Sequence, residues 1–171
     1  MYKRLRDDLG LVYSTGFSQT YKWKAGMLVG YIGCKSDRTR RAIQETVKIM
    51  DELQKNVPKK ELELKRLDVL NSFVFNVDTS AALVNVYGRY HMRKEPMDTL
   101  ERIQDTYISA RKQDLEVLAK KYLDPKNLQI VVVADKTTKV IKENGIETTL
   151  EDDLMSLAKA LCLPYREIPL R

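Results

Sequence analysis

The sequence of 171 residues is poor in the residues that build metal centres and disulfide frameworks. It contains two cysteines, Cys34 and Cys162, and a single histidine, His91. A structural zinc site needs about four clustered ligands, and neither cysteine lies in a CxxC pair or close to the histidine in sequence. The sequence therefore predicts no metal site within this chain, and it favours buried free thiols over a disulfide.

Long apolar runs and low-complexity segments are also missing. No stretch approaches the roughly 18 to 20 apolar residues that a membrane-spanning helix needs. The start of the chain, Met1–Arg4, leads into charged sequence and does not form a signal peptide. Seven glycines and five prolines are too few for a long flexible linker. We therefore expect one domain over residues 1–171 and no membrane partner, while the compartment stays open.

The charge of the chain is positive but evenly mixed. The net charge is +6, from 30 basic and 24 acidic residues, and the two signs alternate in segments such as 58–66. A nucleic-acid interface would gather basic residues on one face with aromatic residues between them. The nearest such stretch, Tyr21–Lys24, is short and is better explained as the tip of a hairpin. We therefore expect no nucleic-acid partner.

The apolar pattern and the turn-forming residues predict an α+β fold. Residues 1–9 are typical of a helix end, which Gly10 stops. Segments 11–20 and 27–34 then form a hairpin of two strands. A later apolar, β-branched run at 128–134 predicts a buried strand. Helices are predicted from a Ser36 or Asp37 cap to about Lys55, from Pro58, from the Asp78–Ser80 cap to Arg93, around 97–103, from a cap near Ser109 to Asp124, and from a Thr149/Asp152 capping box onward. This order predicts an antiparallel sheet with helices packed on one face.

The most informative stretch is 5–14, Leu-Arg-Asp-Asp-Leu-Gly-Leu-Val-Tyr-Ser. Arg6 falls at the end of the predicted helix, and Tyr13 falls at the start of the following strand. This arrangement resembles the substrate-side signature of the insulinase/pitrilysin family of zinc metallopeptidases, which includes the mitochondrial processing peptidases. Segment 103–135, with its Tyr-Leu pair, proline turn, Asn-Leu and apolar strand, resembles the closing helix and strand of the same family.

The resemblance implies a metallopeptidase half-domain of the LuxS/processing-peptidase type, with 1–171 as its C-terminal, substrate-binding domain. The family's domain begins with strands that precede the Arg6 position, and this sequence does not contain them. We therefore expect an N-terminally truncated domain with an open sheet edge. Such an edge favours pairing with a second copy as a homodimer.

The resemblance also implies roles for two residues. In the family, an arginine and a tyrosine of the C-terminal domain hold the substrate backbone and support the tetrahedral intermediate. By position, Arg6 would bind the substrate, and Tyr13 would bind it and support the transition state. The family's zinc lies on an inverted His-x-x-Glu-His motif in the N-terminal domain, which this chain lacks. Zinc would therefore be bound outside this chain, by a partner domain on the same polypeptide or on another subunit, and this chain alone would be inactive towards its peptide substrate.

Other interpretations stay open at this point. From the residues alone, Arg6 would pair with a neighbouring acid such as Asp7 or Asp8, and Tyr13 would pack as a strand aromatic. A non-catalytic scaffold or partner subunit of the same fold is the main alternative function. A basic module that binds nucleic acid is the third hypothesis, which binding that weakens steeply with salt would support.

Overall fold

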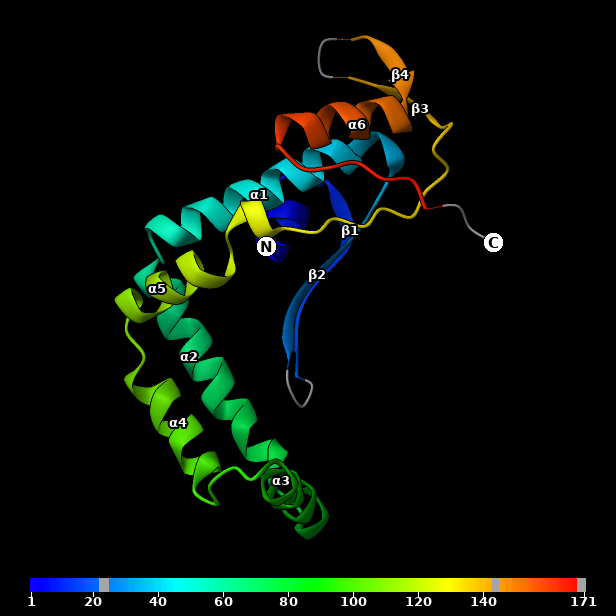
Figure 1. The fold of residues 1–171 in the computed structure, drawn as a ribbon. Helices are drawn as coiled ribbons and strands as arrows, with labels where there is room; N and C mark the ends of the chain where they lie inside the picture. The colour runs from blue at the N-terminus through cyan, green and yellow to red at the C-terminus, as the bar shows by residue number, and fades with distance from the viewer. Residues whose placement is uncertain (22–24, 143–144, 169–171) are drawn as a thin grey trace. The chain divides into compact units, whose positions relative to one another are not determined.

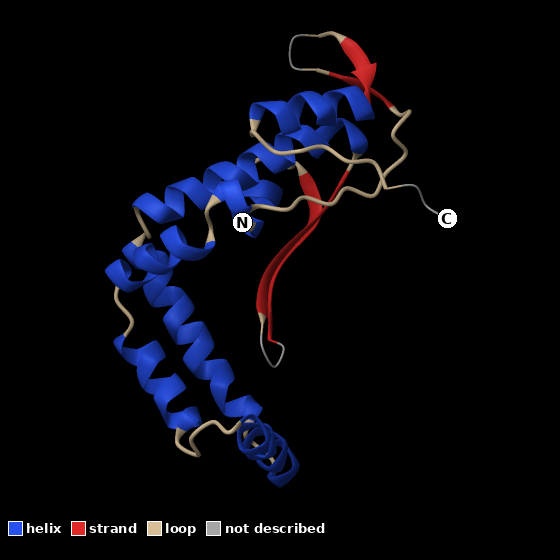
Figure 2. Cartoon of the chain, viewed as in Figure 1, coloured by secondary structure: helices blue, strands red, loops and turns tan. Residues whose placement is uncertain are grey.

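The chain divides into two compact units, one that contains all the described strands and one that is helical (Figures 1 and 2). Unit 1 combines Met1–Asp51 with Leu123–Arg171, and unit 2 is Glu52–Tyr122. The single domain predicted over 1–171 stays a prediction. The computed structural model describes residues 1–21, 25–142 and 145–168.

The first hairpin of unit 1 confirms the strands predicted at 11–20 and 27–34. Strand β1 (Val12–Tyr21) pairs antiparallel with β2 (Gly26–Cys34), and the register shifts by a bulge between Val12 and Ser14. Both strands are rich in β-branched and aromatic residues, which favour extended backbone. The proposed hairpin tip at Lys22–Lys24 lies outside the described residues.

The core of unit 1 lies where the base of this hairpin meets two helices. The π-helix η1 (Lys3–Asp8) buries Leu5 completely, and Leu5 clusters with Leu11, Val12 and Ala42. Ala42 comes from α1 (Thr39–Lys55), whose apolar residues recur on one face. An ion pair between Arg4 and Glu45, 2.9 Å apart, joins the same two helices. Packing against η1 and α1 therefore fixes the start of β1.

The predicted cap of this helix needs a correction. Ser36 and Asp37 lie in a short 3₁₀ turn, η2 (Ser36–Arg38), and α1 begins only at Thr39. The tighter turn uses the residues that were expected to cap the helix. The Arg38 guanidinium of this turn donates to the carbonyl of Gly10, and so it ties the turn to the end of η1.

Helix α6 (Leu150–Ala160) lies alongside the first half of α1 (Figure 1). Its predicted capping-box-like start has the N-cap bond, because the Thr149 hydroxyl accepts from the Asp152 N–H at 3.1 Å, and this hydroxyl also donates to the Asp152 carboxylate at 2.8 Å. Arg40 of α1 reaches across to the buried Asp153, with 3.0 Å between the guanidinium and the carboxylate. The same guanidinium donates to the hydroxyl of Ser156 at 2.7 Å.

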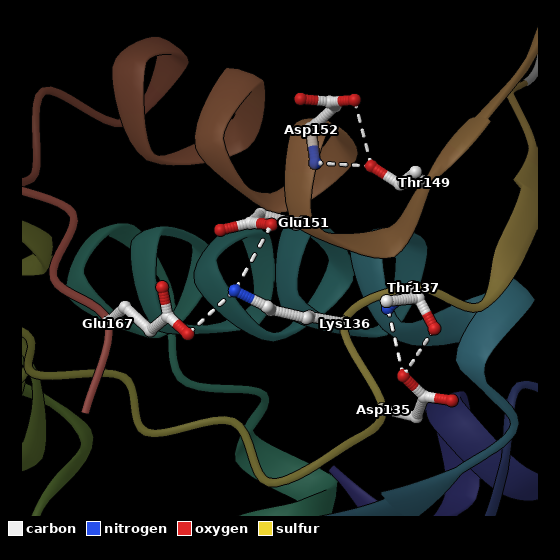
Figure 3. A network of polar contacts seen from close by, with 7 residues as sticks. All are labelled: Asp135, Lys136, Thr137, Thr149, Glu151, Asp152 and Glu167. Carbon is white, nitrogen blue, oxygen red and sulfur yellow. Dashed lines mark hydrogen bonds and ion pairs between the residues drawn. The ribbon is translucent and has the colours of Figure 1, made fainter. Parts of the chain in front are cut away.

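A polar network near the start of α6 joins segment 135–137 to Glu151 of this helix and to Glu167 of the C-terminal segment (Figure 3). The Lys136 ammonium lies 2.7 Å from a carboxylate oxygen of Glu167 and 3.8 Å from one of Glu151. The hydrogen bond to Glu167 raises the pKa of Lys136. Two hydrogen bonds from Thr137 lower the pKa of Asp135. Apart from the half-buried Glu151, these groups are exposed, so the network positions the C-terminal segment more than it stabilises the fold.

Unit 2 consists of helices, and their starts depart in places from prediction. Thr79 caps its helix as predicted and accepts from the Ala82 N–H at 3.1 Å. The helix predicted around 97–103 extends through Ser109, whose hydroxyl donates to the carbonyl of Asp105 and so ends one helix without capping the next. The elements are α2 (Lys59–Phe73), the 3₁₀ turn η3 (Val74–Asn76), α3 (Ser80–Arg93), α4 (Thr99–Ser109) and α5 (Lys112–Tyr122).

One arginine joins two helices of unit 2. Arg66 of α2 donates to the carbonyls of Tyr107 and Ala110, at 2.7 and 2.6 Å, and also to that of Ile108. These carbonyls lie at the C-terminal end of α4, where a helix has no internal donors left for its last carbonyls. A guanidinium supplies several donors in a fixed fork, so Arg66 caps α4 from its neighbour.

The strand predicted at 128–134 is wrong. This segment comes after the 3₁₀ turn η4 (Pro125–Asn127) and pairs with no other strand among the described residues. Within the described residues, no hydrogen bond engages the backbone of 129–134. Val131 and Val133 are 80% and 84% exposed, whereas Ile130 and Val132 are about 38% and 39% exposed. The exposure of its side chains therefore alternates as in a strand with one solvent-exposed face, but among the described residues no neighbouring strand pairs with it.

The observed fold agrees with the α+β class in its coarse features. The structure is a mixture of helices and two small antiparallel sheets, in place of the single sheet that was predicted. The second sheet pairs β3 (Lys139–Ile141) with β4 (Glu147–Thr149), two short strands that sequence analysis missed. Both cysteines are free, but Cys162 is exposed and Cys34 is half-buried, so the expectation of buried thiols fails for Cys162. No helix in the described ranges is long and apolar enough to cross a membrane.

The bare segment 128–134 provides a test of the predicted homodimer. Pairing of two copies along this unpaired segment would place Val131 in or near a strand contact between the copies, where a lysine would be desolvated. We predict that Val131→Lys raises the dissociation constant of the dimer about tenfold or more. Analytical ultracentrifugation over a range of concentrations measures it.

Val84→Lys is the matched control for this variant, because Val84 is also an exposed valine, on helix α3. Its dimer constant should stay within about twofold of the unmodified chain. A chain that stays monomeric at every concentration, or equal constants for the two variants, would contradict pairing through this segment.

Candidate substrate-binding face

Arg6 lies on the exposed side of η1, next to the fully buried Leu5. The centre of its guanidinium lies 5.2 Å from the centroid of the Tyr2 ring, in a cation–π contact. Within the described residues, Arg6 forms no ion pair with Asp7 or Asp8. The packing of Leu5 fixes the backbone that carries Arg6, and the contact with the Tyr2 ring holds the Arg6 guanidinium near the start of the helix.

The turn between η1 and β1 sets the relation between Arg6 and the strand. Gly10 has φ +59°, in the left-handed region that glycine adopts most easily. Its N–H donates to the Arg6 carbonyl at 3.1 Å, and the Leu11 N–H donates to the Leu5 carbonyl at 2.8 Å. Together these bonds close the helix end in the manner of a C-terminal cap. Gly10 is therefore the helix stop that the sequence predicted.

Tyr13 lies in the bulge at the start of β1, where its side chain is 67% exposed. The ring lies across Gly33 of the partner strand, where a Cβ atom would be 2.5 Å from the Tyr13 Cε2 atom. Because glycine has no side chain, the Tyr13 ring can lie directly against the backbone at Gly33. In the described chain, the Tyr13 hydroxyl has no hydrogen-bond partner and remains available.

Arg6 and Tyr13 therefore lie on consecutive elements that share the core around Leu5. No hydrogen bond joins the two side chains within the described residues. The exposed guanidinium of Arg6 and the exposed phenol of Tyr13 lie on either side of the Gly10 turn. Chemically, this pair can donate hydrogen bonds to the carbonyl groups of a peptide chain.

The strands beside this pair carry no charge. None of the 19 residues of β1 and β2 is Asp, Glu, Lys, Arg or His, although 32% of the whole chain is charged. A nucleic-acid interface would place basic side chains here. The face therefore suits a neutral ligand better than a polyanion.

The described residues do not form a zinc site. His91 lies on α3 and is exposed, and no group of three or more His, Cys, Asp or Glu side chains in the described ranges could hold a metal ion. A hollow of about 450 Å³ lies elsewhere on unit 1, beside η2 and β3, and neither Arg6 nor Tyr13 lines it. The candidate site is thus an open face and not an enclosed pocket.

Comparison with known proteins connects this face with one family. The family model described as the peptidase M16 inactive domain matches residues 1–67, the segment from η1 into α2 that contains both Arg6 and Tyr13. This match shows that the segment is similar to the inactive domain of the M16 peptidases. No curated protein and no solved structure matches the chain.

One part of this face was not predicted from the sequence. Tyr31 of β2 is 57% exposed, and its ring lies over Gly16 in the same way that the Tyr13 ring lies over Gly33. The signal was present as two glycines and two tyrosines in facing strands. It could not be read without the register, because the bulge at Val12 changes which residues face each other.

The Gly10 turn generates a direct prediction. A Cβ atom at Gly10 would meet nothing within 4 Å, so Gly10→Ala should cost only the left-handed backbone energy. The expected loss is about 1–2 kcal/mol of unfolding free energy. Urea denaturation followed by circular dichroism measures it.

Gly10→Asn is the control, because asparagine tolerates the left-handed region better than alanine does. It should lose less stability than the alanine variant. If Gly10→Ala were as stable as the original chain, the turn would not constrain the segment that joins Arg6 to Tyr13.

Proposed function

We propose that this chain is the substrate-binding, non-catalytic C-terminal half of a zinc metalloendopeptidase that hydrolyses unfolded peptides. One observation carries the proposal: the match to the peptidase M16 inactive domain covers the segment that holds Arg6 and Tyr13. The exposure of both side chains beside an uncharged hairpin supports it. On its own, this half would not cleave peptides.

The two residues have complementary tasks in this proposal. Arg6 holds the substrate backbone as a permanently charged donor. Tyr13 donates from its hydroxyl to the oxygen that gains negative charge as the peptide carbonyl is attacked. A phenol suits this task because its O–H is a hydrogen-bond donor, while its ring remains supported on Gly33.

The proposal requires a partner. The described residues do not form a zinc site, so zinc would be bound by an N-terminal peptidase domain, on the same polypeptide or on a separate subunit. The match to an inactive domain implies such a partner. The peptide would lie between the two halves as an extended strand, because main-chain hydrogen bonding accepts many sequences.

A scaffold subunit of the same fold is the second candidate function. The contact between the Arg6 guanidinium and the Tyr2 ring favours it, since a guanidinium held by its own helix is less available to a substrate. In that case Arg6 and Tyr13 would stabilise the domain and would take no part in hydrolysis.

Tyr13→Phe separates these two functions. The substitution removes one hydroxyl and keeps the ring that lies on Gly33. In the peptidase assembled from this chain and its zinc-bearing partner, we expect kcat to fall about 100-fold or more, as for the loss of one oxyanion donor. Steady-state hydrolysis of a fluorogenic peptide measures it.

Tyr122→Phe serves as the control, because Tyr122 is an exposed tyrosine on helix α5. Its rate should stay within about twofold of the unmodified enzyme. An unchanged kcat for Tyr13→Phe would exclude the assigned role and would favour the scaffold.

A further inference from the structure

Tyr31 shares a face of the first hairpin with Tyr13. Ser14 pairs with Gly33 and Gly16 pairs with Tyr31, so these two rows are successive positions on one side of the ladder. The Tyr13 ring reaches this side because the bulge turns it over Gly33. The two rings therefore lie on one face, supported by glycines of opposite strands.

The close approach of the Tyr31 ring to Gly16 is specific. A Cβ atom at Gly16 would lie 2.4 Å from Tyr31 Cε1 and 2.7 Å from its hydroxyl oxygen. Such distances leave no room for a side chain at Gly16 while the ring is in place, because the outer atoms of the Tyr31 ring cover Gly16. The Tyr31 backbone is held as well, because the buried Thr15 donates its hydroxyl proton to the Tyr31 carbonyl at 3.0 Å. A ring fixed in this way loses little entropy when it meets a ligand.

We propose that Tyr31 is a second substrate-contact residue, which binds an apolar side chain of an extended, uncharged peptide beside the position that Tyr13 contacts. This inference rests on the proposed function. The spacing of the two rings and the charge of the face identify the ligand.

The spacing fits an extended peptide. Gly33 and Gly16, which support the two rings, belong to successive residue pairs on the same face of the hairpin. Such pairs are two residues, or about 7 Å, apart along the strands. Side chains at positions i and i+2 of an extended peptide recur on one side at the same spacing. A peptide that lies along the hairpin can therefore place one residue at the Tyr13 ring and the next but one at the Tyr31 ring.

The charge of the face selects a neutral peptide. The exposed groups beside the rings are hydroxyl and apolar side chains, such as those of Ser18 and Met27, and neither strand has a charged residue. In the described chain, the Tyr31 hydroxyl has no hydrogen-bond partner, so it can donate to a peptide carbonyl. An acidic or basic segment would find no opposite charge on these strands.

The two tyrosines differ in when they act. Tyr13 is assigned to the transition state, whereas Tyr31 would contact the peptide equally in the ground state and in the transition state. Loss of a uniform contact raises KM and leaves kcat unchanged. In the assembled peptidase, we therefore expect Tyr31→Ala to raise KM about fivefold to tenfold and to keep kcat within about twofold.

Peptide binding to the full 171-residue chain provides a readout that does not depend on catalysis. The probe is a fluorescein-labelled, unstructured decapeptide of alternating leucine and serine, and the signal is fluorescence anisotropy. Tyr31→Ala should raise its Kd about fivefold to tenfold, while Tyr31→Phe, which keeps the ring, should raise it about twofold. Gly16→Ala should reproduce the alanine effect, because the added methyl group displaces the ring.

Gln19→Ala is the matched control on the same strand, since Gln19 is exposed, lies on the opposite face of the ladder and supports neither ring. Thermal unfolding of each variant identifies any loss that comes from the hairpin itself, and Tyr31→Phe carries the test if Tyr31→Ala fails to fold. If the unmodified chain binds the decapeptide and Tyr31→Ala and Gly16→Ala bind it equally well, the inference is wrong and the proposed function stands. If the unmodified chain does not bind the decapeptide, substrate binding by this chain fails, and the inference fails with it.

Discussion

The burial of Leu5 against the base of the first hairpin is the contact on which the candidate site depends. Leu5 is completely buried among Leu11, Val12 and Ala42, and full burial of a leucine side chain contributes about 2 kcal/mol or more. This contact anchors η1 to both β1 and α1, and the Gly10 turn then sets the direction in which the chain enters the strand. Arg6 and Tyr13 keep their relation because the residues beside them are fixed in one small core.

The hairpin that extends from this core has a packed base and an uncharged, partly aromatic surface. Its base packs on η1 and α1, while its strands carry exposed aromatic side chains and no charges. Exposed aromatic residues supported by glycine are costly to keep in water and useful in recognition, since their rings are already fixed. This is why the open face, and not the hollow beside η2, is the better candidate for substrate binding.

The sequence predicted what depends on local signals and failed where tertiary partners decide. The hairpin, the Gly10 stop and the Thr79 and Thr149 caps follow from neighbouring residues, and the structure has them. Residues 128–134 have the composition of a strand, yet a strand needs a neighbour, which the described chain does not supply. Likewise, Arg6 and Tyr13 could be named from a motif, but Tyr31 emerged only from the ladder register.

The central claim is that this chain completes a zinc peptidase whose metal lies on a partner. The most direct measurement is to purify the tagged chain from its source under native conditions and to determine the bound zinc, the co-purifying polypeptides and the peptidase activity. The account predicts about one zinc per complex, carried by a domain with a His-x-x-Glu-His motif, and activity that the isolated chain lacks. A native assembly without such a domain, or a zinc peptidase whose activity does not change when this chain is removed, would contradict it.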